Sequence, residues 1–175
     1  MNPLNKYNIP FLGLSFGKHH FEYKIDNKFF DAFQYTEIQN VNCIAEVILD
    51  KKNNFFEFQI NIDGMVTLTC DVTNELFEEH IHNTIDLVVK FGEEYNDDHL
   101  DILIIPHESF QINVSQYIYE AIVLSIPLKK VHPGVKDGTL QSDLLEKLKE
   151  LEIHEKPNID PRWAQLNQLL TPKKQ

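Results

Sequence analysis

Two histidines set one residue apart, His80 and His82, are the side chains of this sequence that most resemble a metal chelate. Residues two apart on a β-strand point to the same face, so both imidazoles can reach one ion. A zinc site needs three or four protein ligands, however, and the sequence places no evident third ligand beside this pair. We therefore interpret the two histidines as solvated side chains at the start of a strand.

A run of carboxylates, Glu93–Asp101, is the second feature that could bind a cation. It lacks the alternating ligands, the central glycine and the closing glutamate of an EF-hand loop, so we interpret it as a solvated acidic loop. An alternative function combines the two features: a small metal-dependent enzyme that uses His80, His82 and the acidic loop 93–101.

Other signatures of catalysis are missing from the sequence. There is no glycine-rich phosphate loop, no nucleophile elbow, and no Ser/His/Asp or Cys/His arrangement. Cys70 continues a row of alternating apolar residues, so we expect a buried, inert thiol with a raised pKa. We predict that the chain is not an enzyme and has no catalytic residue, no bound metal and no cofactor. No small-molecule substrate is evident.

The composition describes an acidic globular protein. The chain has 175 residues, 42% hydrophobic and 25% charged, which suffices for one domain and a tail. No run of about 18 apolar residues could span a membrane, and the N-terminus lacks the charged and apolar regions of a signal peptide. Two cysteines, Cys43 and Cys70, make no disulfide framework. We therefore expect a cytoplasmic protein without a membrane partner.

The net charge restricts the class of partner. Lys+Arg 16 against Asp+Glu 27 gives −11 at pH 7. Such a surface repels the phosphates of nucleic acid and attracts basic proteins, so contact with a basic protein is easier than broad contact with RNA.

The stretch from Phe55 to Val72 organises the predicted fold. Apolar and polar residues alternate on both sides of Asp63-Gly64, which is a turn signal, and this pattern predicts a β-hairpin. A three-residue loop, Asp63–Met65, keeps the apolar residues of the two strands on one face and sets Phe58 opposite Cys70.

Further alternating segments predict more strands, at 19–25, 41–49, 81–91 and 100–105, and a helix follows at 114–126. We predict an α+β fold, in which an antiparallel meander sheet is covered on one face by a long apolar helix, with short C-terminal helices. One of these helices starts at Ser142 or Asp143, and the last starts at Asp160-Pro161. The expected domains are residues 1–132, the sheet with its cover helix, and residues 133–175, a linker and helical tail.

The order of several short motifs resembles the YceD-like family, the large ribosomal RNA subunit accumulation proteins. The motifs are a strand end with a Cys-Asp-x-Cys-x-Glu pattern, an acidic Phe-Gly-Glu-Glu loop, a Glu-x-x-x-Leu-x-x-Pro helix leading to a histidine, and a C-terminal Asp-Pro turn. In this chain they stand as Cys70–Glu75, Phe91–Glu94, Glu120–Pro127 with His132, and Asp160–Trp163. The resemblance covers most of the chain from about Ile9 onward.

This resemblance implies a non-enzymatic cytoplasmic factor linked to 23S rRNA accumulation or large-subunit assembly. The implied partner is a ribosomal protein or a large-subunit rRNA precursor. The residues that the motifs mark as candidates for partner binding are Cys70, Asp71, Glu75, Glu120, Pro127, His132, Asp160, Pro161, Arg162 and Trp163. Many relatives carry a second cysteine where this chain has Thr73, and another after the histidine. Because Cys70 and His132 alone cannot complete a tetrahedral site, we predict that they bind no metal.

Overall fold

The computed structural model describes residues 3–99, 101–140, 146–147 and 150. The chain divides into two compact units, Met1–Leu140 and Gln141–Gln175, and every element named below lies in the first. Among the described residues, no helix is both long enough and apolar enough to cross a membrane. The predicted starts of the C-terminal helices, at Ser142 or Asp143 and at Asp160, lie outside the described residues. The division predicted at residue 132 stays a prediction.

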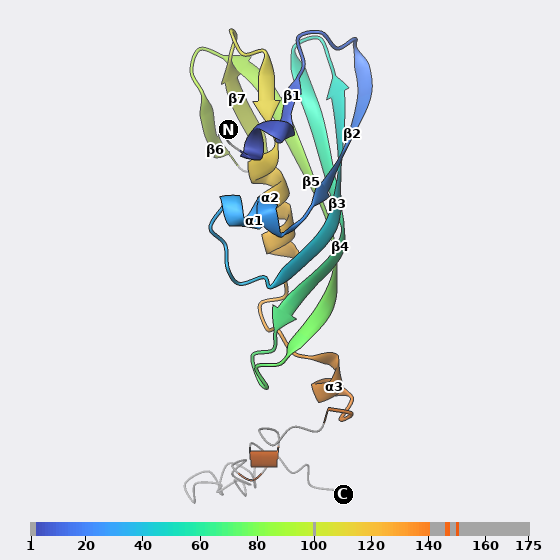
Figure 1. Cartoon of the computed structure of the whole chain (residues 1–175). Coiled ribbons are helices and arrows are strands. Elements are labelled where there is room, and N and C mark those ends of the chain that lie inside the picture. Colours follow the sequence, from blue (N-terminus) through green and yellow to red (C-terminus); the bar gives the residue numbers. More distant parts are fainter. Residues whose placement is uncertain (1–2, 100, 141–145, 148–149, 151–175) are drawn as a thin grey trace, which may run out of the picture. The chain divides into compact units, whose positions relative to one another are not determined.

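A mixed sheet of six strands forms the body of this unit (Figure 1). Its strands in spatial order are β2 (Gly17–Ile25), β3 (Asn40–Lys51), β4 (Phe55–Thr69), β5 (Leu76–Gly92), β7 (Ile102–Pro106) and β6 (Asn96–His99). β2 to β5 are antiparallel neighbours, but β7 pairs with β5 in parallel and lies between β5 and β6. The predicted antiparallel meander is therefore wrong beyond β5. The acidic segment 93–101 is likewise not only a loop, because β6 lies within it.

The hairpin predicted at Asp63–Met65 does not exist. β4 runs unbroken through these residues, and Phe58 lies between Leu49 of β3 and Leu87 of β5 rather than opposite Cys70. The alternation keeps one phase from Phe56 to Leu68, and Gly64 occupies an inward position in that phase. A hairpin with a three-residue turn and an unbroken strand would thus show the same alternation of apolar residues in the sequence. The unbroken strand forms because β4 pairs along its length with both β3 and β5.

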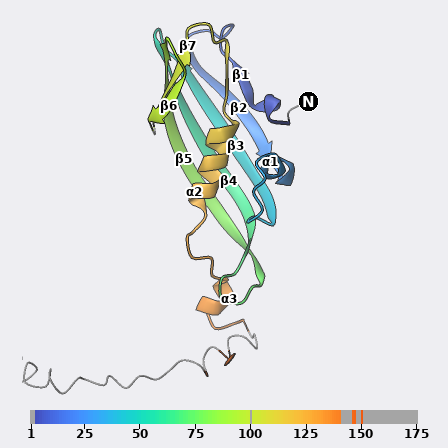
Figure 2. The ribbon, with the colours of Figure 1, turned by 90° about the vertical axis from the view of Figure 1, so that its left-hand side faces the viewer.

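The prediction of a long apolar cover helix is also wrong, because the chain is mostly β. α2 (Ser115–Ser125) has only 11 residues, and it covers part of the face formed by β4 and β5 (Figure 2). The side-chain amide of Asn83 on β5 donates to Ala121 O of the helix at 2.8 Å. The N-cap residue of α2 is Val114, and the Oδ1 of Asn113, just before it, accepts from Ser115 N at 3.0 Å. Gln116 donates from its side-chain amide to Glu120 on the next turn.

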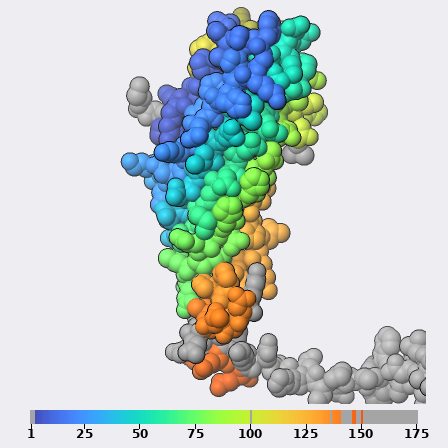
Figure 3. Space-filling model, turned by 90° about the vertical axis from the view of Figure 1, so that its right-hand side faces the viewer, coloured from blue at the N-terminus to red at the C-terminus, as the bar shows by residue number. Residues whose placement is uncertain are grey.

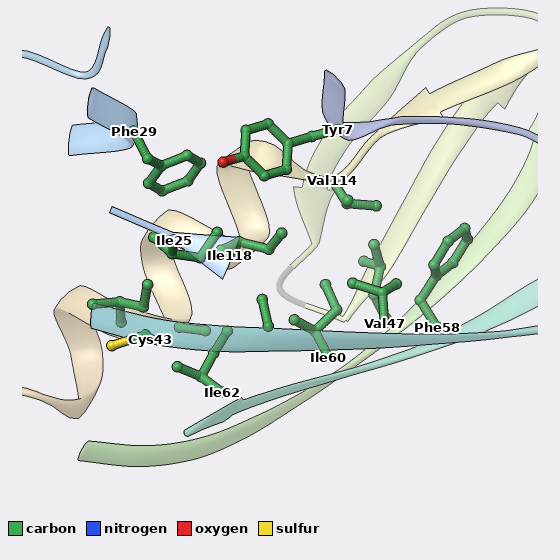
Figure 4. Close-up of a cluster of buried hydrophobic side chains, with 14 of the residues drawn as sticks. Tyr7, Ile25, Phe29, Cys43, Val47, Phe58, Ile60, Ile62, Val114 and Ile118 are labelled. Atoms are coloured by element: carbon green, nitrogen blue, oxygen red, sulfur yellow. The ribbon is translucent and has the colours of Figure 1, made fainter. Parts of the chain in front are cut away.

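Several short N-terminal elements cover the rest of this face. They are the 3-10 helix η1 (Pro3–Tyr7), β1 (Asn8–Pro10), which pairs with β8 (Gln111–Asn113), and α1 (Asn27–Ala32). The ring of Tyr7 lies 5.0 Å from that of Phe29, centroid to centroid, above the inward side chains of β3 and β4 (Figure 4). The core therefore lies between the sheet and a second layer. This layer is formed by η1, β1 and α1 from the start of the chain and by β8 and α2, which follow the strands of the sheet.

Three of the strands predicted from alternation, at 19–25, 41–49 and 81–91, are present within β2, β3 and β5. On β3, the alternating residues from Val41 to Leu49 are buried, and on β5 the apolar residues from Ile81 to Phe91 point inward. Phe21, Tyr23 and Ile25 form the inward face of β2. These strands each have one buried face, and such a strand needs apolar residues at every second position. The sequence therefore carries the alternation from which the strands were predicted.

The opposite face of the sheet is open. Along most of this side, no helix of the described part of the chain covers β2 to β5. The short helix α3 (Pro133–Lys136) adjoins only the Leu76 end, where Pro133 lies near Thr67 and Glu78. The outward side chains are mostly exposed (Figure 3). These strands carry seven acidic residues and three lysines on their outward positions. The acidic residues are Glu22, Glu46, Asp50, Glu57, Asp63, Glu78 and Asp86, and the lysines are Lys18, Lys24 and Lys90. We call this surface the open acidic face.

Candidate functional site

The first motif residues lie in the turn that joins β4 to β5. The backbone N–H of Cys70 donates to Glu75 O at 2.8 Å, and that of Asn74 donates to Cys70 O at 2.9 Å. Asn74 has a φ of 60°, a left-handed conformation that asparagine adopts more readily than most residues. The turn therefore closes on itself and fixes the position of the Cys70 side chain.

The segment after α2 is bound to this turn. Asp71 N donates to Lys130 O, and Lys130 N donates to Asp71 Oδ2, both at 2.7 Å. His132 N donates to Cys70 Sγ at 3.3 Å. Residues 70–75 and 130–134 thus form one hydrogen-bonded cluster at the end of the sheet, which we call the Cys70 corner.

The thiol of Cys70 is buried, as predicted, but its pKa moves in the direction opposite to our prediction. Burial opposes ionisation and by itself would raise the pKa. Hydrogen bonds from the backbone N–H groups of His132, Thr73 and Val72, and from the Thr73 side chain, outweigh burial and lower the pKa below the usual thiol value. The prediction that Cys70 is buried is therefore confirmed, and the predicted direction of its pKa is wrong.

His132 has a structural role in the corner. Its Nδ1 accepts a hydrogen bond from Gly134 N at 2.9 Å and thereby caps the short helix α3 (Pro133–Lys136). Its ring packs edge-on against Phe77, with 5.8 Å between the ring centroids. One ring nitrogen is thus occupied within the chain.

The prediction that the corner binds no zinc stays a prediction. Among the described residues, no group of three or more His, Cys, Asp or Glu side chains is arranged to hold a metal ion. Thr73, three residues after Cys70, provides a hydroxyl group and not a second thiolate. Elemental analysis of the purified chain should find far less than one zinc per chain. About one zinc per chain, lost on Cys70→Ser, would contradict this.

The remaining predicted site residues do not gather at one place. Glu75 and Asp71 lie in the corner with Cys70 and His132, and Pro127 stands between α2 and the corner. Glu120 lies on α2 and bonds to Gln116, away from the corner hydrogen bonds. The motif Asp160, Pro161, Arg162 and Trp163 lies outside the described residues.

His80 and His82 lie on β5 in the open acidic face, and Asp63 of β4 pairs directly with His82. Asp63 Oδ2 is 3.4 Å from His80 Nε2 and 3.6 Å from His82 Nδ1, and all three side chains are more than half exposed. The acidic segment 93–101 lies near the other end of β5, which pairs with β7 only from Val88 onward. The structure thus separates the two halves of the alternative metal-dependent enzyme.

A pocket of about 400 Å³ lies between the β6–β7 edge and the N-terminal half of α2. Its floor is apolar and includes Leu103 and Ile105 of β7 and Ile112 of β8. Three carboxylates and two tyrosines stand around this floor: Asp97, Asp98, Glu120, Tyr95 and Tyr117. The pocket can accept a ligand that is partly apolar and positively charged.

Sequence reasoning identified Glu120 through its motif but missed the other residues of the pocket. Tyr95 and Asp97 belong to a segment that we interpreted as a solvated loop, and no local pattern reports its pairing with β7. Lys130, which ties the corner to Asp71, was missed for the same reason: its partner lies 59 residues away in the sequence.

Comparison with known proteins gave one match. The family model described as "Large ribosomal RNA subunit accumulation protein YceD" matches residues 58–170, which is more than half of the chain. No significant match was found among curated proteins or among solved structures. The matched region includes the Cys70 corner, the pocket and the C-terminal motif.

Proposed function

The chain belongs to the YceD family of large ribosomal RNA subunit accumulation proteins, and on that premise we propose that it is a non-enzymatic, cytoplasmic factor in the assembly of the large subunit. In this proposal it supports the accumulation of 23S rRNA by binding a basic ribosomal protein. The family description names the accumulation of the RNA, and the proposal concerns how this chain contributes to it.

The open acidic face is the observation that carries the proposal. Its outward positions have seven carboxylates against three lysines, within a chain of net charge −11. RNA binding generally requires a concentration of positive charge, because affinity for the phosphate backbone comes from lysine and arginine contacts. This face has the opposite charge and is complementary to a basic protein. Such complementarity accelerates association and favours basic partners over acidic ones.

The open acidic face can also bind a basic protein that, left free, would bind RNA without specificity. The strands present carboxylates at regular spacing over a surface without a covering helix, so several basic side chains can be neutralised together. A ribosomal protein held in this way stays soluble until its rRNA site competes for the same basic residues. Accumulation of the RNA would then depend on an orderly supply of the protein.

The proposal can be tested by affinity purification from the native cell with and without nuclease. We expect a basic large-subunit protein to remain bound after nuclease treatment. Reversing three charges of the open acidic face, Glu22→Lys, Glu46→Lys and Glu78→Lys, should remove that protein from the eluate. All three side chains are exposed, so the thermal transition should move little.

A matched control reverses three exposed charges elsewhere, Glu93→Lys, Glu94→Lys and Glu108→Lys. It changes the net charge equally, and we expect the partner to be retained. If nuclease releases every ribosomal component from the parent chain, the contact is with RNA and the protein-binding proposal fails. Equal loss from both variants would show that the effect is one of net charge alone.

A further inference from the structure

We propose that the pocket between β6, β7 and α2 binds one lysine or arginine side chain of an extended segment of the basic partner, and that Leu124 contacts an apolar residue beside it. This inference rests on the proposed function, because it names a recognition site for the same kind of partner. It concerns a surface separate from the open acidic face.

The charge of the pocket favours a cation. Asp97, Asp98 and Glu120 line it, and neither lysine nor arginine is among its lining residues. Glu120 has a hydrogen bond from Gln116 Nε2 to its Oε1 at 2.7 Å, which orients the carboxylate on the helix. The pKa of Tyr117 is raised by burial, and further by nearby Tyr95, Asp97 and Glu120. The same electrostatic field that disfavours a phenolate in this place favours a positive charge.

The shape and chemistry of the pocket fit a long side chain with a charged end. Its volume of about 400 Å³ lies toward the low end of the range for ligand pockets, roughly 300–1,000 Å³. Leu103, Ile105 and Ile112 can contact the methylene groups of a lysine or arginine, which pack well on apolar surface. Tyr95 and Tyr117 provide aromatic rings for the cation. Carboxylates at the rim then pair with the charged group.

An exposed leucine extends the site along the helix. Glu120 lies three residues after Tyr117 and four residues before Leu124, so the three side chains lie along one stripe of α2. Leu124 is 74% exposed, which is unusual for a leucine in a helix that packs on a sheet. A bound segment that places a basic residue in the pocket can cover this leucine with its next apolar residue. The expected ligand is therefore a segment that alternates basic and apolar residues.

Polyamines offer the same cationic chemistry without an apolar neighbour, so the test must separate the two sources. The probe is a fluorescein-labelled peptide of repeating Arg-Leu-Gly units, and its binding is followed by fluorescence anisotropy with spermidine as competitor. The pocket variant is Asp97→Asn with Glu120→Gln. The matched control is Asp31→Asn with Asp137→Asn, two exposed carboxylates outside both the pocket and the open acidic face, and it removes the same charge.

The pocket variant should raise the Kd of the peptide about tenfold, and the control should change it less than about twofold. Leu124→Ala should raise the Kd of the peptide about threefold and leave spermidine binding unchanged. Circular dichroism melting of each variant confirms that the fold is retained. An equal effect of the pocket and control pairs would overturn the proposal, because binding would then follow net charge. If spermidine displaces the peptide completely and Leu124→Ala has no effect, the occupant is a polyamine and the proposed ligand is wrong.

Failure of the pocket proposal can be distinguished from failure of the proposed function. If the peptide does not bind in the pocket but a basic ribosomal protein still co-purifies after nuclease treatment, only this inference fails. If the peptide binds in the pocket but no ribosomal protein co-purifies, the proposed function fails and the pocket serves another basic partner.

Discussion

Gly64 shows how one residue determines the spacing of two long strands. A Cβ atom at this position would lie 2.5 Å from both the carbonyl oxygen of Asn42 and the Cα of Cys43. Both are backbone atoms of β3, so they cannot move without disturbing the pairing of β3 with β4. Glycine is needed here for close approach of two backbones, a common reason for glycine inside a strand.

We therefore predict that Gly64→Ala lowers the free energy of unfolding by about 1–3 kcal/mol, the usual cost of overpacking. Urea denaturation measures this change. Gly13→Ala is the control, because nothing lies within 4 Å of a Cβ at Gly13. An effect at Gly64 as small as that at Gly13 would show that the strands separate without cost.

The two cysteines differ in their titration. Burial raises the pKa of Cys43 to about 11, and the carboxylate of Asp63 adds to this effect, while a backbone hydrogen bond from Asn42 opposes it. The thiol also donates to Met65 O at 3.8 Å, a bond that requires the protonated form. At Cys70 the backbone N–H groups that point at the sulfur reverse the effect of burial.

The pKa of Cys43 predicts a pH dependence of stability. The folded state keeps the proton up to about pH 11, whereas the unfolded chain loses it near pH 9, so the stabilisation is present below pH 9 and is lost as the pH rises to 11. The free energy of unfolding of the parent chain should fall by about 2–3 kcal/mol more than that of Cys43→Ala over this interval. Urea denaturation of both proteins at pH 8 and at pH 11 gives the difference. Parallel losses would show that other groups cause the alkaline sensitivity.

At the scale of the elements, the Cys70 corner couples the end of the sheet to the segment after α2. Three hydrogen bonds make this connection. Two of them join Asp71 and Lys130, and one of these is accepted by the Asp71 carboxylate. The third runs from the backbone N–H of His132 to the Cys70 sulfur. Since Asp71 is exposed, its bonds with Lys130 can open without exposing the main core.

Asp71→Ala should therefore act locally. We expect the amide of Lys130 to exchange about tenfold faster, because it loses its acceptor, while the amides of β3 and β4 keep most of their protection. The global loss of stability should be about 1–2 kcal/mol. Hydrogen exchange with mass spectrometry distinguishes the two regions. Glu78→Ala, an exposed position on β5, is the control. A uniform rise in exchange along the chain would contradict local opening.

Strands with one buried face were predictable, but their connections were not. Alternation located β2, β3 and the greater part of β5 because burial itself produces that pattern. It could not distinguish a hairpin from a continuous β4, because Ile62, Gly64 and Val66 keep the same phase in both. The turn preference of Asp63-Gly64 suggested the hairpin, and pairing with β3 and β5 over the whole strand overrides it.

The sequence likewise predicted only part of the candidate site. Motif order marked ten candidates without grouping them, and the structure gathers four of these, Cys70, Asp71, Glu75 and His132, in the corner. The pocket requires the placement of β7 between β5 and β6, which depends on distant pairing and leaves no local signal. The direction of the Cys70 pKa likewise depends on N–H groups whose orientation only the folded turn provides.

At the scale of the whole molecule, the distribution of charge predicts a role for the C-terminal end. Arg162, Lys173 and Lys174 make that end locally basic in a chain of net charge −11. These residues lie outside the described part of the chain, and their role stays a prediction from the sequence. An alternative is that Trp163 and the leucines after it only attach this end to the rest of the chain.

Charge reversal at Arg162, Lys173 and Lys174 should leave the thermal transition nearly unchanged and weaken association with large-subunit precursors. The loss should be larger at low salt, because exposed charges interact less when salt screens them. Sedimentation of cell extracts measures the fraction that travels with the precursors. A variant that sediments with them as well as the parent does would show that these charges make no contact.

The length of β5 has a consequence for how much of the sheet a bound partner can cover. Its 17 residues extend over roughly 55 Å at about 3.3 Å per residue. The Cys70 corner adjoins its first residue, Leu76, and β7 with the pocket adjoins its last, Gly92. A small domain is only about 30 Å across, so one such domain cannot touch both ends. A small partner bound at the pocket therefore leaves the Cys70 corner uncovered.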